Sequence, residues 1–199
     1  MTAIIVEGTD RCGKSTLIKK MMGYFAGTTP MEWLHYSSVK GLTDQEQTDL
    51  FKVTFDHMFK LITTDNAIWF LDRSHLGERV YGPMYRPKMN VQYIWDLEKK
   101  YKISEREDIA LIMLYDSSFK CLERDDGDSY TTDLEKSKQE VKYFKEAYYG
   151  TSIRKKIMID IANKNEDQVW FEVYDFLKDS LYSKRYVVPN SLIREHVES

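Results

Sequence analysis

The stretch AIIVEGTDRCGKST, residues 3–16, carries the pattern that decides the fold. Residues 3–7 are almost continuously apolar, and a helical spacing of apolar residues begins at Lys14. Between them, residues 8–15 have the pattern Gly, four other residues, then Gly-Lys-Ser, which is the spacing of a loop that binds phosphate. In such a loop the glycines let the backbone approach phosphate closely, and successive N–H groups point inward. A strand before the loop and a helix after it are the context that this motif requires.

Two side chains at the end of the loop have expected roles. Lys14 reaches the β- and γ-phosphates of ATP, and the Ser15 hydroxyl binds magnesium. The N-terminus of the following helix adds its partial positive charge. The loop residues expected to bind this cofactor are Gly8, Cys12, Gly13, Lys14, Ser15 and Thr16.

Short apolar runs alternate with helical spacing along the rest of the chain. Strand character is found at residues 3–7, 33–36, 67–72, 109–115 and 156–161. Helical spacing is found at residues 14–25, 43–62, 91–101 and 134–149, and a last helix starts at Asn165, with Gln168 completing a capping box. This alternation predicts an α/β fold, a five-stranded parallel sheet with helices on both faces. We expect one domain over residues 1–199, with a loop at residues 77–89 and an extra tail at residues 180–199.

Composition and charge exclude several classes of protein. Lys and Arg total 29 and Asp and Glu total 32, so the net charge of −3 gives no general attraction to nucleic acid or anionic membranes. The apolar runs are far shorter than the roughly 20 residues that cross a bilayer, and no secretory signal is visible. Two cysteines do not make a disulfide framework. We expect a cytoplasmic protein whose partners are small-molecule nucleotides, not membranes or free nucleic acid.

A second motif follows the apolar run at residues 67–72. Asp72, Arg73 and Ser74 stand at the carboxyl end of this strand, where open parallel sheets bind their ligands. A carboxylate there can hold magnesium directly or through water, and an arginine can bind phosphate through two parallel hydrogen bonds. The alternative is a surface salt bridge or a helix cap at Asp72. Beside a phosphate loop, the motif favours a magnesium site formed by Ser15 and Asp72.

Together these motifs resemble the thymidylate kinase family of nucleoside monophosphate kinases. The resemblance rests on VEGTDRCGKST at residues 6–16 and on the strand-terminal Asp72-Arg73. It continues through DSSFKCLER at residues 116–124 and KIMIDIA at residues 156–162, and it covers about residues 2–178. The related deoxynucleoside kinases carry Glu-Arg-Ser where this chain has Asp-Arg-Ser.

The resemblance implies a three-layer P-loop kinase fold with a short lid at about residues 123–136, and a homodimer. Asp10 matches the loop aspartate that contacts the sugar 3′-hydroxyl in this family, which implies deoxyribose. Arg73 matches the arginine that binds the acceptor phosphate, and Asp72 matches its acidic neighbour near magnesium. These matches assign acceptor and metal to the same edge of the sheet.

The charge of the lid segment bears on which arginines act in catalysis. Residues 123–136 hold six acidic residues against two basic ones, Arg124 and Lys136. Arg11 matches the loop arginine of family members whose lid lacks catalytic arginines. We therefore expect the catalytic charge to come from Arg11, Lys14 and Arg73, with Arg11 and Arg124 also contacting the cofactor.

The acceptor side departs from the family pattern. Lys40 is the only basic residue just after the second strand, where the family has an arginine. Phe51 falls near the family's base-stacking aromatic, and Phe55 occupies the place of its base-reading arginine. Arg79 lies in a segment unlike the family's usual one, and it is included among the expected acceptor contacts. These departures leave the identity of the base open.

The chemistry of the acceptor separates the candidate functions. A monophosphate oxygen is already an anionic nucleophile, so its phosphorylation needs positive charge and positioning, not a base. A nucleoside 5′-hydroxyl needs a carboxylate to accept its proton, and residues 36–40 contain none. We expect ATP-dependent phosphorylation of dTMP or another pyrimidine deoxynucleoside monophosphate to the diphosphate. A deoxynucleoside kinase and a kinase acting on nucleotides within DNA remain alternatives, whereas a GTPase is rejected because the switch elements are missing.

Cys12 has two interpretations. Arg11, Lys14 and a helix N-terminus would favour its thiolate and make it reactive. Alternatively, its side chain is turned into the core as a small apolar filler.

Overall fold

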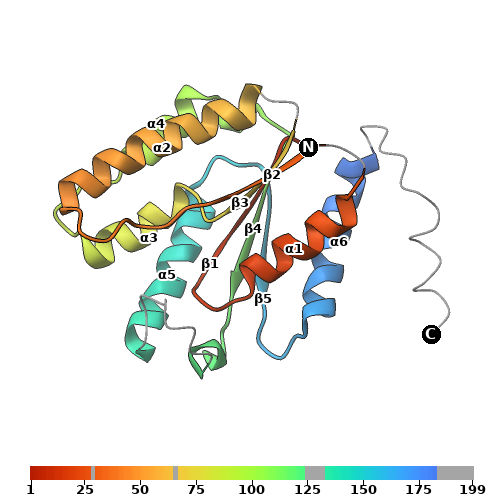
Figure 1. The fold of residues 1–199 in the computed structure, drawn as a ribbon. Helices are drawn as coiled ribbons and strands as arrows, with labels where there is room; N and C mark the ends of the chain where they lie inside the picture. The colour runs from red at the N-terminus through yellow and green to blue at the C-terminus, as the bar shows by residue number, and fades with distance from the viewer. Residues whose placement is uncertain (28–29, 65–66, 124–132, 183–199) are drawn as a thin grey trace.

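The protein is a three-layer α/β structure built on five parallel strands (Figure 1). The computed structural model describes residues 1–27, 30–64, 67–123 and 133–182. The strands are β1 (Ala3–Gly8), β2 (Met31–His35), β3 (Ile68–Asp72), β4 (Ile109–Tyr115) and β5 (Lys155–Asp160). The helices are α1 (Lys14–Phe25), α2 (Asp44–Thr64), α3 (Leu76–Tyr85), α4 (Tyr93–Lys100), α5 (Leu134–Gly150) and α6 (Glu166–Tyr182), with short 3-10 turns η1 (Ile103–Glu105) and η2 (Lys120–Glu123).

The sheet has the strand order β2-β3-β1-β4-β5, and every neighbouring pair is parallel. β1 lies at its centre, and all six of its residues are buried. Alternate side chains enter two cores: Ile4 and Val6 pack under α1 and α6, whereas Ala3 and Ile5 pack under α2, α3 and α5. Burial on both faces explains the continuous apolar runs of the sequence. The predicted fold class is confirmed.

Local predictions were met to different degrees. The capping box at the start of α6 is confirmed, because Asn165 and Gln168 exchange backbone-to-side-chain hydrogen bonds of 2.9 Å in both directions. The loop predicted at residues 77–89 is wrong, since most of it forms α3. Pro83 lies late in this ten-residue helix, where its missing N–H costs a single bond of the ladder. Leu76 and Val80, both fully buried, pack the segment on the core and favour a helix over a loop.

Some expectations fall on residues outside the described ranges. Most of the lid expected at residues 123–136 lies there, as does most of the tail expected at residues 180–199. At the far end of the lid segment, Asp133 caps α5 by accepting a 2.8 Å hydrogen bond from the Lys136 N–H. No helix among the described residues is both long enough and apolar enough to span a membrane.

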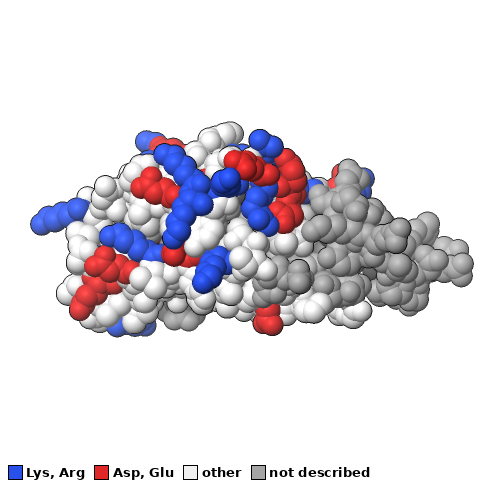
Figure 2. All heavy atoms as spheres, turned by 90° about the horizontal axis from the view of Figure 1, so that it is seen from above, with Lys and Arg blue, Asp and Glu red and all other residues white. Residues whose placement is uncertain are grey.

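The surface charges of the described residues are mixed in sign. Figure 2 shows Lys and Arg side chains interspersed with Asp and Glu on the face seen from above. Such a face presents no broad single-sign field, in keeping with the small net charge of the sequence.

Candidate active site

The candidate site lies at the carboxyl ends of β1 and β3, which are neighbours in the sheet with Val6 opposite Asp72. The connections after β1, β4 and β5 lie together at the lower edge of the sheet in Figure 1. The loop after β1 depends on Gly8, because an added Cβ would meet the Leu114 carbonyl oxygen at 1.8 Å. Gly13 has a φ of 78° and leads directly into α1. Both loop glycines therefore stand where the backbone requires glycine.

Lys14 is drawn into the loop that precedes it. Its Nζ donates hydrogen bonds to the carbonyl oxygens of Gly8 at 3.0 Å and Thr9 at 2.7 Å, and the residue is buried. Burial, and then the positive charge of Arg73, lower the pKa of Lys14. An ammonium held by neutral carbonyls in a buried position gains strongly from an anion, so this arrangement suits the binding of phosphate.

A hydroxyl and a carboxylate meet beside the first turn of α1. The Ser15 hydroxyl donates to Asp72 Oδ2 at 2.6 Å, and His35 Nδ1 lies 3.2 Å from the same oxygen. Asp72 is 1% exposed, and its Oδ1 has no hydrogen-bond partner. Ser15 and Thr16 are exposed at the start of the helix. A hard oxygen pair with one unpartnered buried oxygen fits magnesium, which keeps several waters and is shared with substrate phosphates.

No group of three or more His, Cys, Asp and Glu side chains that could hold a metal ion is found among the described residues. The fit to magnesium therefore rests on Ser15 and Asp72 alone.

Arg73 lies at the centre of a polar cluster whose members come from the phosphate loop, the end of β3, α3 and α5. Its guanidinium bonds Asp10 Oδ1 at 2.5 Å and the Tyr81 hydroxyl at 3.3 Å, and lies 5.7 Å from the centre of the Tyr81 ring. Its backbone has a φ of 70°, a conformation that costs a residue with a Cβ roughly 1–2 kcal/mol. This backbone turns the side chain back over the phosphate loop toward Asp10.

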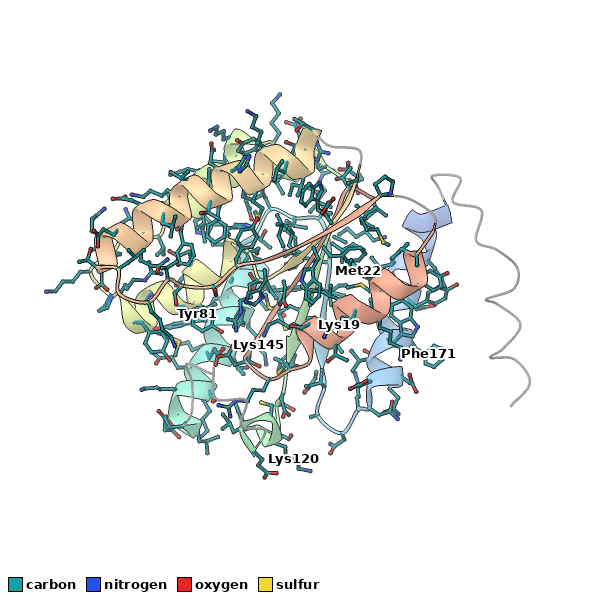
Figure 3. All side chains as sticks on the ribbon, in the orientation of Figure 1. Lys19, Met22, Tyr81, Lys120, Lys145 and Phe171 are labelled. Atoms are coloured by element: carbon teal, nitrogen blue, oxygen red, sulfur yellow. The ribbon has the colours of Figure 1, made fainter. Side chains whose placement is uncertain are left out.

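Tyr81 and Glu140 complete this cluster. The Tyr81 hydroxyl of α3 (labelled in Figure 3) donates to Glu140 Oε1 of α5 at 2.6 Å, and the Asp10 N–H donates to the same oxygen at 3.3 Å. Burial, and then the charge of Glu140, raise the pKa of Tyr81 well above its ordinary value, so it remains a neutral hydroxyl donor. The cluster thus contains one cation, two carboxylates and a hydroxyl, all facing the phosphate loop.

Tyr81 and Glu140 are functional residues that the sequence motifs do not include. Tyr81 lies in the segment of residues 77–89, whose prolines predict a loop and not a helix facing the site. Glu140 carried a usable signal, since it lies on the apolar stripe of α5 between Ser137 and Phe144, all of them buried. A charged residue in such a stripe needs a partner, and here the partners are Tyr81 and the Asp10 N–H.

The other residues expected to contact the acceptor do not belong to the Arg73 cluster. Lys40 is exposed between β2 and α2. Arg79 pairs with Glu146 of α5 at 3.1 Å, which ties α3 to α5. Phe51 and Phe55 stack at 5.3 Å, but Phe55 is 2% exposed and packs on the core, so Phe51 is the better platform for a base. Arg124 lies outside the described residues.

Arg11 links the phosphate loop to the segment that leads to the lid. It has a φ of 63°, and its guanidinium donates to the Leu122 carbonyl oxygen at 2.8 Å. The residue is half-buried, so the guanidinium can exchange this neutral acceptor for a phosphate oxygen.

We expect Arg11→Ala to lower kcat at saturating ATP by about 10²-fold, because it removes a preorganised charge next to the phosphates. Arg124→Ala, from the acidic lid segment, is expected to cost less. Steady-state assays of the two variants under one set of conditions compare them directly. A larger loss in Arg124→Ala would show that the lid supplies the catalytic charge.

Cys12 is turned into the core as a small apolar side chain, the second of the two interpretations of the sequence. Its side chain is 3% exposed and belongs to the core under α1 and α6. Its Sγ lies 2.7 Å from the Thr9 hydroxyl. A hydrogen bond from the Cys121 thiol is the main influence that lowers the pKa of Cys12, against the effect of burial. As a ligand of the cofactor, Cys12 can therefore contribute its backbone N–H but not its side chain.

We expect both thiols to react with iodoacetamide at least about tenfold more slowly in the native than in the unfolded protein, since reaction requires local opening. Cys12 should react before Cys121, because a hydrogen bond from Cys121 favours the Cys12 thiolate. Mass spectrometry of timed digests follows each site. Alkylation of Cys12 at the rate of the unfolded chain would show that the thiol faces solvent.

The strand order, the phosphate loop after the central strand and the strand-terminal Asp-Arg pair define a P-loop kinase fold. Comparison with solved structures assigns this fold to the thymidylate kinase-like type. Thymidylate kinase of Candida albicans is 17% identical, with a TM-score of 0.60 over 89% of this chain and 91% of that one. The YorR protein of Bacillus subtilis, solved in complex with phosphorylated GDP, is 16% identical, with a TM-score of 0.63 over 90% and 98% of the two chains.

Comparisons of sequence give no further assignment. No protein-family model matches the chain, and no curated protein matches it either. The resemblance of the sequence motifs to the thymidylate kinase family is thus confirmed at the level of the fold.

Proposed function

We propose that this protein is an ATP-dependent kinase of pyrimidine deoxynucleoside monophosphates. The observation that carries the proposal is the cluster in which Arg73 and Asp10 face each other beside the phosphate loop. At this point the Arg73 guanidinium can bind the phosphate of an acceptor, and the Asp10 carboxylate can accept a hydrogen bond from its sugar hydroxyl. The similar folds support a nucleotide kinase, and the residues support the choice of acceptor.

The transfer moves the γ-phosphoryl group of ATP to an oxygen of the acceptor phosphate. The bond between the γ-phosphorus and the β–γ bridging oxygen breaks, a bond from the acceptor oxygen to phosphorus forms, and ADP leaves. The attacking oxygen is already anionic, so the protein supplies charge and alignment. Lys14 leaves the Gly8 and Thr9 carbonyls for the β- and γ-phosphates, and the backbone N–H groups of the loop hold the same oxygens.

Magnesium, when bound, neutralises charge on the ATP phosphates. Ser15 and Asp72 are the residues that would hold it, as their 2.6 Å contact and the unpartnered Asp72 Oδ1 support.

Acceptor binding exchanges one set of contacts for another. The acceptor phosphate takes the Arg73 guanidinium from Asp10, and the released Asp10 carboxylate accepts a hydrogen bond from the sugar 3′-hydroxyl. Tyr81 stays hydrogen-bonded to Glu140 and closes the site beside the sugar. Phe51, half-buried on α2, is the platform on which the base stacks. As further parts of this proposal, the resemblance supports a homodimer, and the sequence composition supports a cytoplasmic location.

We expect dUMP to be phosphorylated with a kcat/KM at least about tenfold above that of UMP. Asp10 is assigned to the sugar 3′-hydroxyl, and a ribose 2′-hydroxyl would need room beside the hydrogen-bonded pair of Tyr81 and Glu140. Coupled measurement of ADP release, with dTMP, dUMP, dCMP, UMP and the purine deoxynucleotides as acceptors, checks this. Equal values for UMP and dUMP would contradict the sugar assignment. A purine as the best acceptor would contradict the base assignment.

A further inference from the structure

The buried carboxylate of Glu7 holds the turn that carries Arg73. Glu7 is the residue before the phosphate loop and is 0% exposed. Its Oε1 accepts hydrogen bonds from the Ser74 N–H at 2.6 Å, the Ser74 hydroxyl at 2.7 Å and the Gly77 N–H at 3.3 Å. One oxygen therefore fixes the residue after Arg73 and satisfies an N–H in the first turn of α3.

Two successive residues of β1 hold this turn. The Arg73 N–H donates to the Val6 carbonyl oxygen at 3.0 Å, and the next N–H, that of Ser74, donates to Glu7. Between these two bonds the backbone of Arg73 adopts its left-handed φ of 70°. A residue with a Cβ keeps such a conformation only where its surroundings hold it. The Val6 carbonyl thus holds the backbone on the N-terminal side of Arg73, and Glu7 Oε1 holds it on the C-terminal side.

The remaining features of Glu7 argue against a direct part in the reaction. It is fully buried, and its Oε2 has no hydrogen-bond partner. Burial raises the pKa of Glu7, while the hydrogen bond from Ser74 and the charges of Arg73 and Lys14 oppose this rise. The transfer itself needs no base, because its nucleophile is already an anion.

We propose that Glu7 is a positioning residue, whose Oε1 sets the Arg73 turn and so fixes where the guanidinium meets the acceptor phosphate. The expected change in the acceptor KM rests on the proposed function, whereas the expected change in the conformation of Arg73 does not. Glu7 acts as a hydrogen-bond acceptor in a fixed place, and the position of its Oε1 matters more for this role than its negative charge.

Three substitutions separate the place of the oxygen from its charge. Glu7→Gln keeps an acceptor oxygen at the same reach and removes the charge. Glu7→Asp keeps the charge but withdraws the oxygens by one methylene, and Glu7→Leu removes both. We expect the acceptor KM to stay within about threefold of wild type in Glu7→Gln and to rise by about tenfold or more in Glu7→Asp and Glu7→Leu. The KM for ATP should change by less than about twofold in all three.

Val173→Ala is the control for lost stability, since Val173 is fully buried in the core on the other face of the sheet. It should lower the melting temperature and leave both KM values unchanged. If Glu7→Leu does not fold, Glu7→Asp and Glu7→Gln decide the question. A wild-type acceptor KM in Glu7→Asp together with a raised one in Glu7→Gln would overturn the proposal, because charge would then be what matters.

Crystal structures of the Gln and Asp variants give a second readout that needs no activity. Arg73 should keep its positive φ and its bond to Asp10 in Glu7→Gln, and should lose both in Glu7→Asp. An unchanged Arg73 in Glu7→Asp would overturn the proposal. A wild-type protein that phosphorylates no deoxynucleotide would instead contradict the proposed function, while the geometry of Arg73 would still test the role of Glu7.

Discussion

Replacement of Lys14 by alanine is expected to lower kcat/KM for phosphoryl transfer by about 10³-fold or more, with the protein still folded. Lys14 is the buried cation of the phosphate loop, and its two bonds to loop carbonyls would be replaced by bonds to the β- and γ-phosphates. Because charge develops on those phosphates during transfer, the loss should fall on kcat as well as on ATP binding. Steady-state kinetics of purified Lys14→Ala measure both.

Lys19→Ala is the matched control for this variant. Lys19 belongs to the same helix, is exposed and is labelled in Figure 3. Its removal should leave the kinetics at wild-type values, and circular dichroism should show both variants folded. Wild-type turnover in a folded Lys14→Ala protein would contradict the assignment of the loop to ATP.

Arg73→Ala is expected to lower kcat/KM for the acceptor by on the order of 10²- to 10³-fold, with a smaller effect on the KM for ATP. The guanidinium is the group that Asp10 and Tyr81 hold beside the phosphate loop. Without it, the acceptor phosphate loses its two-point contact, and Asp10 and Glu140 are left as uncompensated negative charge near an anionic substrate. Initial rates measured with each substrate varied in turn separate the two effects.

Arg106→Ala provides the comparison, since Arg106 pairs with Asp108 just before β4, at the opposite end of the sheet from the site. Kinetics equal to wild type are expected for this variant. A loss in Arg73→Ala that fell mainly on the KM for ATP would show that this arginine binds the donor and not the acceptor.

The central part of the fold could be predicted from the sequence, because its signals are local. The apolar run of β1, the glycines at residues 8 and 13 and the helical spacing from Lys14 lie within one stretch of the chain. By contrast, α3 was missed because its glycines and Pro83 resemble a loop when read locally. The docking of Leu76 and Val80 on the core overrides that local signal.

For the site, residues of the phosphate loop, of the first turn of α1 and at the ends of strands could be predicted, whereas the contacts made from within α3 and α5 could not. Asp72 ends β3 and Arg73 follows it at the ligand edge of the sheet, and the structure brings both to the phosphate loop as expected. Tyr81 and Glu140 enter the site through the packing of α3 against α5. The buried stripe of α5 indicates that Glu140 needs a partner, but no local pattern identifies Tyr81 as that partner. The same packing explains Arg79, which pairs with Glu146.

The central claim is that the γ-phosphoryl group of ATP passes to the phosphate of a pyrimidine deoxynucleotide. The most direct measurement incubates the protein with magnesium and ATP labelled at its γ-phosphate, together with dTMP or dUMP, and separates the products by chromatography. The label should appear in the deoxynucleoside diphosphate in an amount equal to the ADP formed, and its rate of appearance should fall by about 10³-fold or more when Lys14→Ala replaces the wild type. Label found in a nucleoside monophosphate when thymidine or deoxyuridine is the acceptor, with none in any diphosphate, would contradict the account.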